Sequence, residues 1–443
     1  MRQHLFLLGV AICCMDVLVC AGAQDALGTP RMWSGTVVSS ACNADEAFNE
    51  SPECIRSVPG AKLALYDDTN RVMYGLEPQS AVKAGLGEAV TVRGTLDGDF
   101  IHVASVEAMT LGLAVGQRAP AFSMRDQFGR VQTLETLKGT SGPVLLFFRS
   151  ADWLPFCKGQ LVQLQDASKR FEKQGVKLAA VSYDSEAILK FFSERHKIDY
   201  PLLGDPDSKT ITAYGVLNPE ATGMQKGFAR PGYFYIDTKG IIREKFFDPK
   251  YRERLTGNSI IAKLFPELGQ EVSQTVEAPH LQLALEQSDT TGVPGTRITL
   301  VAEVRLLPDV HVYAPGAKGY RPIRLELDAL PEMKFSPAIY PESKILFLPV
   351  INERVPVFDG TFRISQDVKV STSAEFWGSL GKDGKTFAIA GKLDYQACDK
   401  TTCYLPTSVP VKWELHVYAL DRMRAPERSL QSFGARQSDW VAL

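Results

Sequence analysis

In "VLLFFRSADWLPFCKGQLVQLQ", residues 144–165, an apolar run meets a turn that carries one cysteine. The run has the length and composition of a buried strand. "KGQLVQLQDASKRFEKQG", residues 158–175, has apolar residues at helical spacing. Cys157 therefore lies where a central strand gives way to a helix, which is the edge at which α/β proteins place their chemistry.

The segments that follow continue this pattern. "VKLAAVSYD" at 176–184 is a second buried strand, and "EAILKFFSERHKI" at 186–198 has helical spacing. "YFYIDTKGIIREKFF" at 233–247 is typical of a hairpin that turns through Thr238-Lys239-Gly240. The sequence thus predicts the order β-α-β-α-β-β.

Several spaced motifs carry a family resemblance. Besides the opening stretch they are "VGQRAPAFSMRDQFGRVQTLETLKG" (115–139), "YPLLGDPDSKTITAYGV" (200–216) and "RPGYFYIDTKGIIREKFF" (230–247). Residues 113–265 resemble the thioredoxin-like redoxins of the alkyl hydroperoxide reductase and thiol-specific antioxidant group, within an expected domain of residues 113–268. The resemblance implies a thioredoxin-like α/β domain and a thiol-dependent antioxidant or disulfide oxidoreductase.

The active-site motif departs from that family at one position. Leu154 stands where the family has the first cysteine of Cys-x-x-Cys or the threonine of a peroxiredoxin, and Cys157 matches the second, or peroxidatic, cysteine. The resemblance implies a cis-proline at Pro231 beside the site and an arginine, Arg149 or Arg230, that steadies the thiolate. Trp153 belongs to the same turn. A single sulfur excludes dithiol exchange within this site.

Two interpretations of Cys157 stay open. The start of a helix and a nearby arginine favour a thiolate, whereas the apolar Trp153, Leu154, Pro155 and Phe156 disfavour it. In the first interpretation Cys157 is a one-cysteine peroxidase thiol that becomes a sulfenic acid and awaits a second thiol. In the second, it is a core residue that remains after activity was lost.

Residues 1–23 have the layout of a secretory signal. Arg2 precedes the apolar "LFLLGVAICCMDVLVC", and Ala21-Gly22-Ala23 offers a cleavage site. Lipid attachment at Cys20 is the weaker interpretation because bulky Val19 precedes it. No later run reaches the roughly 20 apolar residues that a membrane span needs. We therefore expect a mature chain without a membrane span, periplasmic or secreted.

The number and spacing of the cysteines indicate which of them are paired. Of eight cysteines, three lie in the signal segment, which leaves an odd number in the mature chain: Cys42, Cys54, Cys157, Cys398 and Cys403. An oxidising compartment favours disulfides and leaves one thiol unpaired, which by spacing is Cys157.

Residues 30–110 alternate apolar and polar positions in short runs, which predicts a small β-barrel, OB-like by resemblance. Cys42 and Cys54 lie on its loop "ACNADEAFNESPECIRS", residues 41–57. We expect them to form a structural disulfide with Cα atoms under about 7 Å apart. Two free buried thiols are the alternative.

Residues 276–420 return to short strands and turns, which predicts a β-sandwich. "HVYAPGAKGYRPIRLELDAL" (311–330) and "LDYQACDKTTCYLP" (393–406) resemble the N-terminal domain of the thiol:disulfide interchange protein DsbD. The resemblance implies an immunoglobulin-like sandwich in which Cys398 and Cys403 are a redox pair. A static structural disulfide is the alternative.

Charge and histidine spacing exclude other classes of protein. A net charge of −2 with interspersed signs gives no reason to expect a nucleic-acid partner. None of the six histidines has metal-ligand spacing to a cysteine, so neither a zinc site nor a Cys-His protease is expected. We expect no cofactor and no metal.

The sequence as a whole predicts an exported thiol-dependent oxidoreductase. Cys157 would reduce a peroxide or a protein disulfide, with Cys398 and Cys403 as its exchange pair and an exported thiol protein as electron donor. The polar segment "FPELGQEVSQTVEAP", residues 265–279, would tether the two domains flexibly, and residues 421–443 would form a mobile tail. The alternative is a carrier or binding protein in which only the pair is redox-active and the redoxin domain is degenerate.

Overall fold

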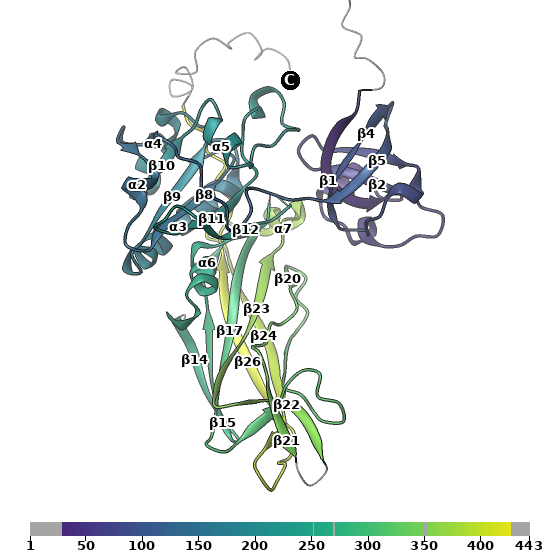
Figure 1. Cartoon of the computed structure of the whole chain (residues 1–443), viewed down its shortest axis with the longest axis vertical. Coiled ribbons are helices and arrows are strands. Elements are labelled where there is room, and N and C mark those ends of the chain that lie inside the picture. Colours follow the sequence, from purple (N-terminus) through teal and green to yellow (C-terminus); the bar gives the residue numbers. More distant parts are fainter. Residues whose placement is uncertain (1–28, 251, 269–270, 349–351, 427–443) are drawn as a thin grey trace, which may run out of the picture.

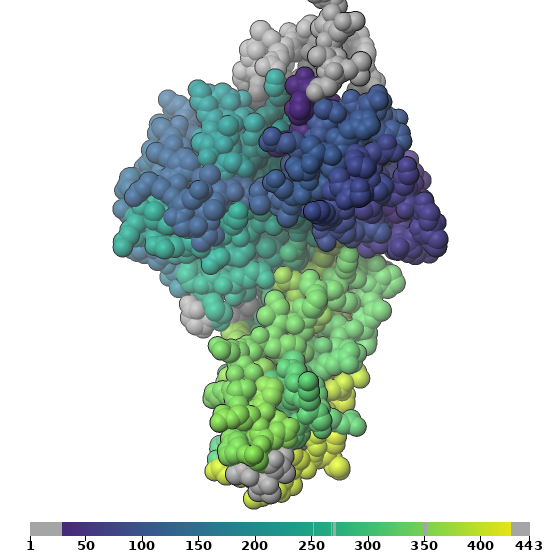
Figure 2. Space-filling view, turned by 45° about the vertical axis from the view of Figure 1, so that its right-hand side comes forward, coloured from purple at the N-terminus to yellow at the C-terminus, as the bar shows by residue number. Residues whose placement is uncertain are grey.

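The structure, a computed structural model, describes residues 29–250, 252–268, 271–348 and 352–426. It contains a β-barrel, an α/β domain and a long β-sandwich (Figure 1). The barrel and the α/β domain lie side by side, and the sandwich extends away from both as a narrower body (Figure 2). The predicted signal segment 1–23 lies outside the described residues. No helix in the described part of the chain is long and apolar enough to cross a lipid bilayer.

The barrel closes in the order β1-β2-β3-β5-β4, with β3 and β5 parallel. Trp33, Val37, Leu65 and Ile101 form part of its core. A Cβ atom at Gly35 would lie 2.3 Å from the carbonyl oxygen of Tyr66, so this close crossing of strands needs glycine. The elements are β1 (Arg31–Ser39), α1 (Ala44–Phe48), η1 (Pro52–Ile55), β2 (Leu63–Asp67), β3 (Val72–Glu77), η2 (Gln79–Ala81), β4 (Ala89–Asp97) and β5 (Phe100–Ala108).

The α/β domain is built on a seven-stranded sheet of order β12-β11-β8-β9-β10-β6-β7. Strands β8, β9 and β10 are parallel, and every residue of β8 is buried because hydrophobic clusters cover both faces of the sheet. The predicted β-α-β-α-β-β order corresponds to β8-α3-β9-α4-β11-β12. The strands are β6 (Met124–Asp126), β7 (Val131–Gln132), β8 (Gly142–Phe147), β9 (Val176–Ser182), β10 (Leu202–Gly204), β11 (Gly232–Ile236) and β12 (Ile242–Phe247); the helices are α2 (Leu134–Leu137), α3 (Pro155–Lys173), α4 (Glu186–His196), α5 (Lys209–Ala213), η3 (Gly223–Gln225) and α6 (Gly257–Leu264).

The sandwich packs its sheets around one large hydrophobic cluster that includes Trp413, whose indole Nε1 donates to the Glu286 carbonyl at 3.0 Å. Its sheets have the orders β14-β15-β17-β23-β20, β16-β26-β24-β19 and β21-β22-β18-β25. The elements are η4 (Pro266–Leu268), β14 (Glu271–Ala278), β15 (Leu281–Gln287), β16 (Thr291–Gly292), β17 (Thr296–Leu306), β18 (His311–Tyr313), β19 (Arg324–Leu327), β20 (Met333–Phe335), β21 (Lys344–Leu348), β22 (Glu353–Asp359), β23 (Thr361–Val370), α7 (Ala374–Ser379), β24 (Lys385–Tyr395), β25 (Ala397–Cys398) and β26 (Thr407–Val417).

The predicted flexible tether between the last two domains is wrong. Most of it is β14, which pairs along its length with β15, because the alternating residues of the segment complete the edge of the sheet. In addition, β13 (Arg254–Leu255), which follows the hairpin of β11 and β12, pairs in parallel with β17 of the sandwich. The two domains therefore share a sheet.

Buried charges fix the three bodies to one another. The ammonium group of Lys369 on β23 lies 2.9 Å from Glu50 of the barrel and 2.5 Å from Glu253 of the α/β domain. Burial alone would raise the pKa of Glu50, but Lys369 and Lys250 hold it at about 2. Each of the three bodies thus contributes a charge to one junction.

The C-terminal segment after β26 also differs from the expectation of a mobile tail. Its described part, residues 418–426, runs back over the α/β domain. There Asp421 pairs with Arg195 at 2.7 Å and Arg424 pairs with Asp152 at 2.6 Å. The remaining residues of the predicted tail, 427–443, lie outside the described residues.

Candidate functional site

Cys157 lies in the first turn of α3, which begins at Pro155 directly after the loop that follows β8. Its side chain is fully buried, and it is the one free cysteine of the described residues. Leu154 is the N-cap of the helix and, being apolar, makes no side-chain capping hydrogen bond. The sulfur therefore lies at a helix start where the N-cap side chain accepts no hydrogen bond from the first backbone N–H groups.

Asp184, at the end of β9, braces the loop that leads to Cys157. Its carboxylate accepts hydrogen bonds from the Ala151 backbone N–H at 2.7 Å and from the hydroxyls of Ser150 and Ser182 at 2.8 and 2.9 Å. Burial raises the pKa of Asp184 to about 6, although these bonds oppose the rise. The loop is thus fixed by a buried carboxyl group.

The cation beside the sulfur is Arg254, from β13. Its guanidinium Nη2 lies 4.0 Å from Cys157 Sγ, and Nη1 donates to the Glu253 carbonyl at 2.9 Å. The side chain is 5% exposed, its Nε has no hydrogen-bond partner, and it forms no ion pair with a carboxylate in the part of the chain that the structure describes. A buried positive charge without a counter-ion is costly, so this guanidinium would attract negative charge that develops on the adjacent sulfur during a reaction.

The two arginines predicted for this role make other contacts. The Arg149 guanidinium stacks over the Phe228 ring, 4.4 Å from its centroid. Arg230 forms a buried ion pair with Glu220 at 2.6 Å, and Glu220 in turn accepts from the Ser34 backbone of the barrel. Arg230 is thus part of the contact between the α/β domain and the barrel. No sequence signal distinguished Arg254, because its position depends on the pairing of β13 with a distant strand.

The two other residues predicted beside Cys157 are Trp153 and Pro231. The indole Nε1 of Trp153 donates to the Tyr183 hydroxyl at 2.8 Å, which anchors the loop to the end of β9. Pro231 is buried at the start of β11, but the expected cis peptide bond before it is wrong: the cis bond among the described residues is Glu77–Pro78. The preceding residue, Arg230, is fixed by a backbone bond to the Val216 carbonyl at 2.6 Å, and the chain enters β11 in the ordinary trans form.

The sandwich covers the start of α3. Phe156 packs edge-on against Trp377 of α7, with ring centroids 5.2 Å apart. Gly159 faces Val293, and a Cβ at this glycine would lie 2.6 Å from a Val293 methyl carbon. Leu420 packs against the same hydrophobic cluster that contains Cys157. These contacts place parts of the sandwich and of the C-terminal segment around the helix start that carries the buried thiol.

The second sulfur site is the disulfide between Cys398 and Cys403, whose Cα atoms are 4.0 Å apart. Cys398 is buried on β25, whereas Cys403 is exposed. The hydroxyl of Tyr313 lies 3.6 Å from both sulfur atoms. Cys403 is thus the residue of the pair that lies at the surface, while Cys398 is enclosed.

Aromatic and acidic side chains surround this pair. Tyr313 stacks on Tyr320 at 4.2 Å, and the Tyr320 hydroxyl donates to Glu353 at 2.8 Å. The Tyr404 hydroxyl donates to Asp399 at 2.6 Å, and this bond lowers the pKa of Asp399. Next to the pair in sequence, Gln396 donates to the Tyr404 carbonyl and Tyr395 donates to the Pro279 carbonyl.

The structure does not bring the two sulfur sites together. Strand β24 begins near α7, which contacts Phe156, and ends just before Cys398. Its 11 residues span about 35 Å at the usual rise of a strand. Figure 1 accordingly shows α7 beside the α/β domain and β22, in the sheet of the disulfide, at the far end of the sandwich. Exchange between Cys157 and the pair within one such chain is therefore excluded in this arrangement.

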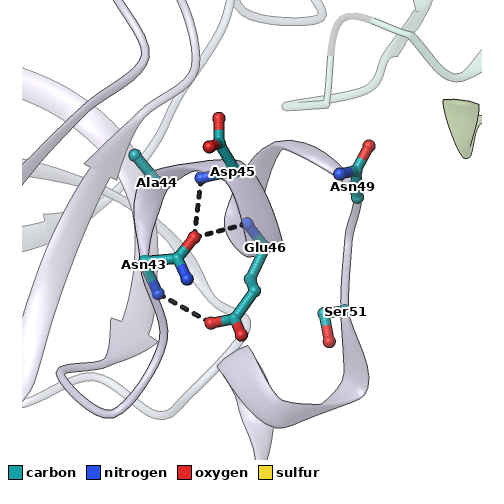
Figure 3. Close-up of a pocket in the computed structure, with 6 residues that line it drawn as sticks. All are labelled: Asn43, Ala44, Asp45, Glu46, Asn49 and Ser51. Atoms are coloured by element: carbon teal, nitrogen blue, oxygen red, sulfur yellow. Dashed lines mark hydrogen bonds between the residues drawn. The ribbon is translucent and has the colours of Figure 1, made fainter.

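Cys42 and Cys54 are joined by a disulfide in the barrel, with Cα atoms 4.9 Å apart. Between them lies a polar hollow around α1 (Figure 3). Its groups already bond to one another: Asn43 Oδ1 accepts from the backbone of Asp45 and Glu46, and Glu46 accepts from the Asn43 backbone. The hollow is thus a helix-capping arrangement that fits the predicted structural role.

Comparisons with known proteins concern the α/β domain. A family model described as the AhpC/TSA family matches residues 115–245. Alkyl hydroperoxide reductase E of Mycobacterium tuberculosis is 35% identical over 133 residues, which cover 30% of this chain and 83% of that protein. The chloroplastic peroxiredoxin Q of Populus jackii is 32% identical over 131 residues, 29% of this chain and 57% of that protein. The crystal structure of peroxidoxin BcpB from Mycobacterium tuberculosis, 24% identical, covers 31% of this chain and 86% of its own with a TM-score of 0.28.

Proposed function

This chain belongs to the AhpC/TSA family through residues 115–245, and on that premise we propose that Cys157 reduces hydroperoxides. Membership of the family indicates a thiol-dependent oxidoreductase of the peroxidase class. The observation that carries the assignment to Cys157 is the buried Arg254 guanidinium 4.0 Å from its sulfur. No carboxylate of the described residues pairs with this cation, so it can stabilise the negative charge that the sulfur carries as it attacks a peroxide.

The proposed reaction balances as follows. The Cys157 thiolate attacks one peroxide oxygen, an S–O bond forms, the O–O bond breaks, and the leaving oxygen takes a proton to become an alcohol or water. The sulfur is thereby oxidised by two electrons to a sulfenic acid. A first external thiol displaces water to give a mixed disulfide, and a second thiol releases Cys157 together with an external disulfide.

The electron donor must come from outside the chain. Both disulfides of the described residues lie away from Cys157, one in the barrel and one at the far end of the sandwich. We therefore assign reduction of the sulfenic acid to an external thiol protein. A periplasmic or secreted location is part of the proposal, supported by the signal-like residues 1–23 and by the two disulfides, which persist in oxidising compartments.

The test is single-turnover oxidation. The purified protein is mixed with hydrogen peroxide in the presence of dimedone, and adducts on the Cys157 peptide are measured by mass spectrometry. We expect an adduct on Cys157 and a loss of peroxide consumption of roughly a thousandfold or more in Cys157→Ser. Cys403→Ser is the matched control and should form the same adduct at the same rate. Full activity of Cys157→Ser would refute the proposal.

A second function is favoured by the other sulfur site. We propose that Cys398 and Cys403 exchange electrons with a thiol protein, as the resemblance to the DsbD N-terminal domain implies. An incoming thiolate would attack exposed Cys403, and Cys398 would leave as a thiolate beside the Tyr313 hydroxyl. Burial raises the pKa of Tyr313, so its hydroxyl keeps the proton that it donates.

In this second function the redoxin domain would be degenerate, which the complete burial of Cys157 and the apolar Leu154 support. The finer fold assignments belong with it: we propose an immunoglobulin-like sandwich for the domain of the pair and an OB type for the barrel, the latter supported by its strand order. Reduction of the disulfide by a dithiol, followed by alkylation of Cys398 and Cys403, tests the exchange directly. A pair that resists reduction until the domain unfolds would be a structural disulfide.

A further inference from the structure

Residues 420–426, here called the strap, lie on the loop and helix that carry Cys157. The strap follows β26 and contains no helix or strand. Its contacts join two residues that flank the thiol in sequence, Asp152 and Lys158, to the C-terminal part of the chain. These contacts are unrelated to the sheet pairing that joins the domains.

Asp152 is the first anchor. Its carboxylate accepts from Arg424 Nε and Nη2 on one oxygen, at 2.8 and 2.6 Å, and from the Ala425 backbone N–H on the other, at 2.6 Å. Asp152 is 3% exposed and Ala425 8%. A carboxylate bound in this way by a guanidinium and a peptide N–H recognises an extended segment by both its side chain and its backbone.

Lys158 is the second anchor. Its ammonium group is 1% exposed and donates to the Met423 carbonyl at 2.7 Å, and it lies 4.0 Å from Asp421. Burial lowers the pKa of Lys158. A buried lysine whose hydrogen-bond acceptor is a backbone carbonyl of the strap is a feature of a site that accepts a peptide.

Asp421 provides the third contact. Its carboxylate lies 2.7 Å from Arg195 and 3.2 Å from His196, both at the end of α4. The strap thus presents an acid at 421 and a base at 424 to groups of opposite charge on the α/β domain. The intervening Arg422 and Met423 are exposed.

These contacts are mostly polar, which makes the strap easier to detach than a packed strand. Leu420 is its one large side chain that packs against the cluster containing Cys157, and the Arg424 side chain is 45% exposed. Partly exposed ion pairs contribute little to stability and weaken with salt. Segments with few buried apolar contacts open at low free-energy cost.

We propose that Asp152, Lys158, Arg195 and His196 form a peptide-binding site beside Cys157, which the strap occupies as an intramolecular ligand. The ligand class is an extended peptide with an acidic residue three positions before a basic one. While the strap is bound, Cys157 is shielded; when the strap leaves, Cys157 becomes accessible and the site can accept such a segment of another protein. This inference rests on the proposed function only in that Cys157 is the reacting thiol.

The test measures alkylation of Cys157 by iodoacetamide in the folded full chain, without peroxide, so its outcome is independent of peroxidase activity. Arg424→Glu places a negative charge against Asp152 and should accelerate alkylation about tenfold or more, since a charge-assisted pair is lost. Arg422→Glu is the matched control, because it makes the same charge change at an exposed strap residue for which no side-chain contact with the α/β domain is recorded. It should leave the rate unchanged.

A charge reversal and a peptide complete the test. Asp152→Arg combined with Arg424→Glu restores the ion pair and should restore protection. A chain that ends after Ala419 should react as fast as Arg424→Glu, and the synthetic peptide LDRMRAP should slow its alkylation again, whereas a peptide with the two key charges exchanged should not. Equal rates for Arg424→Glu and the unchanged chain, or equal acceleration by Arg422→Glu, would overturn the proposal.

Discussion

The two sulfur sites of this chain differ in nearly every physical respect. Cys157 is a single, fully buried thiol within a hydrophobic cluster, with the Arg254 guanidinium 4.0 Å from its sulfur. Cys398 and Cys403 form a disulfide at the far end of the sandwich, where one sulfur is exposed. The first arrangement encloses its sulfur, whereas the second places one of its two cysteines at the surface.

This difference indicates that the sites act independently. A tether was expected to let them meet, but β14 and the β13–β17 pairing hold the domains end to end. With about 35 Å between the ends of β24, the sites do not share electrons directly. Variants that affect one site should therefore leave the other unchanged.

The largest effect is expected at Arg254. Arg254→Met removes the cation beside the sulfur, and peroxide oxidation of Cys157 should slow by roughly a hundred- to a thousandfold, the usual effect of losing a group that stabilises charge at a reacting atom. Arg254→Lys keeps the charge and should recover part of the rate. Reduction of the Cys398–Cys403 disulfide, measured in the same samples, should stay constant. An unchanged Cys157 rate in Arg254→Met would remove the physical argument for its thiolate.

The next largest effect distinguishes the barrel disulfide, to which we assign a structural role, from the two sulfur sites to which we assign redox roles. Replacing Cys42 and Cys54 together by serine should lower the free energy of unfolding of the barrel by about 3 kcal/mol. This is the contribution expected from a disulfide that closes a loop of this length. Peroxide turnover should not change. Thermal unfolding followed by calorimetry checks the first statement, and a loss of turnover in a folded double variant would place chemistry in the barrel.

The two sites also hold carboxyl groups whose pKa values are shifted in opposite directions. Burial raises the pKa of Asp184, below the Cys157 loop, from 3.8 to about 6, whereas the Tyr404 hydroxyl lowers the pKa of exposed Asp399. The raised pKa means that the folded protein binds this proton more tightly, so the contribution of Asp184 to stability is lost as pH rises through 6.

Asp184→Asn tests this contrast. Between about pH 4 and pH 6 the unchanged chain should lose about 2 kcal/mol of unfolding free energy through this group, and the variant should not. The quantity to measure is therefore the difference in unfolding free energy between the two proteins at each pH. A difference that stays constant across that range would mean that Asp184 titrates normally.

The smallest effect is expected at the exchange pair. Tyr313→Phe removes the hydroxyl 3.6 Å from both sulfurs and should slow reduction of the disulfide about threefold, because one weak hydrogen bond to the leaving thiolate is lost. Tyr320→Phe keeps the stacked ring and loses only a bond to Glu353, so it serves as the control. Alkylation of Cys157 should be the same in both variants.

The sequence predicted what depends on local pattern. The apolar run of β8, the helix α3 and the position of Cys157 between them follow from periodicity over about 20 residues. The residues that complete the site depend on contacts far along the chain. Arg254 reaches the sulfur because β13 pairs with β17, and Trp377 reaches Phe156 from the sandwich.

The errors have the same origin. Residues 271–278 are polar enough to indicate a linker, yet an edge strand with one solvated face has the same composition. Residues 421–426 are polar because they bind to charged side chains of the α/β domain, not because they are free in solvent. In both segments the amino-acid composition indicated that the side chains are exposed. It did not indicate which contacts the backbone makes.

The strap follows the α/β domain in sequence, and this sets an order of events during synthesis. The α/β domain has emerged by about residue 265, whereas Arg424 and Ala425 follow about 160 residues later, roughly 10–30 s at ordinary rates of translation. Throughout that interval Asp152 and Lys158 have no partner from the strap, and Trp377 has not yet reached Phe156. If the strap shields Cys157 as proposed, a newly made chain passes through a period in which Cys157 is more open to oxidants and thiols, and synthesis of residues 420–426 closes that period.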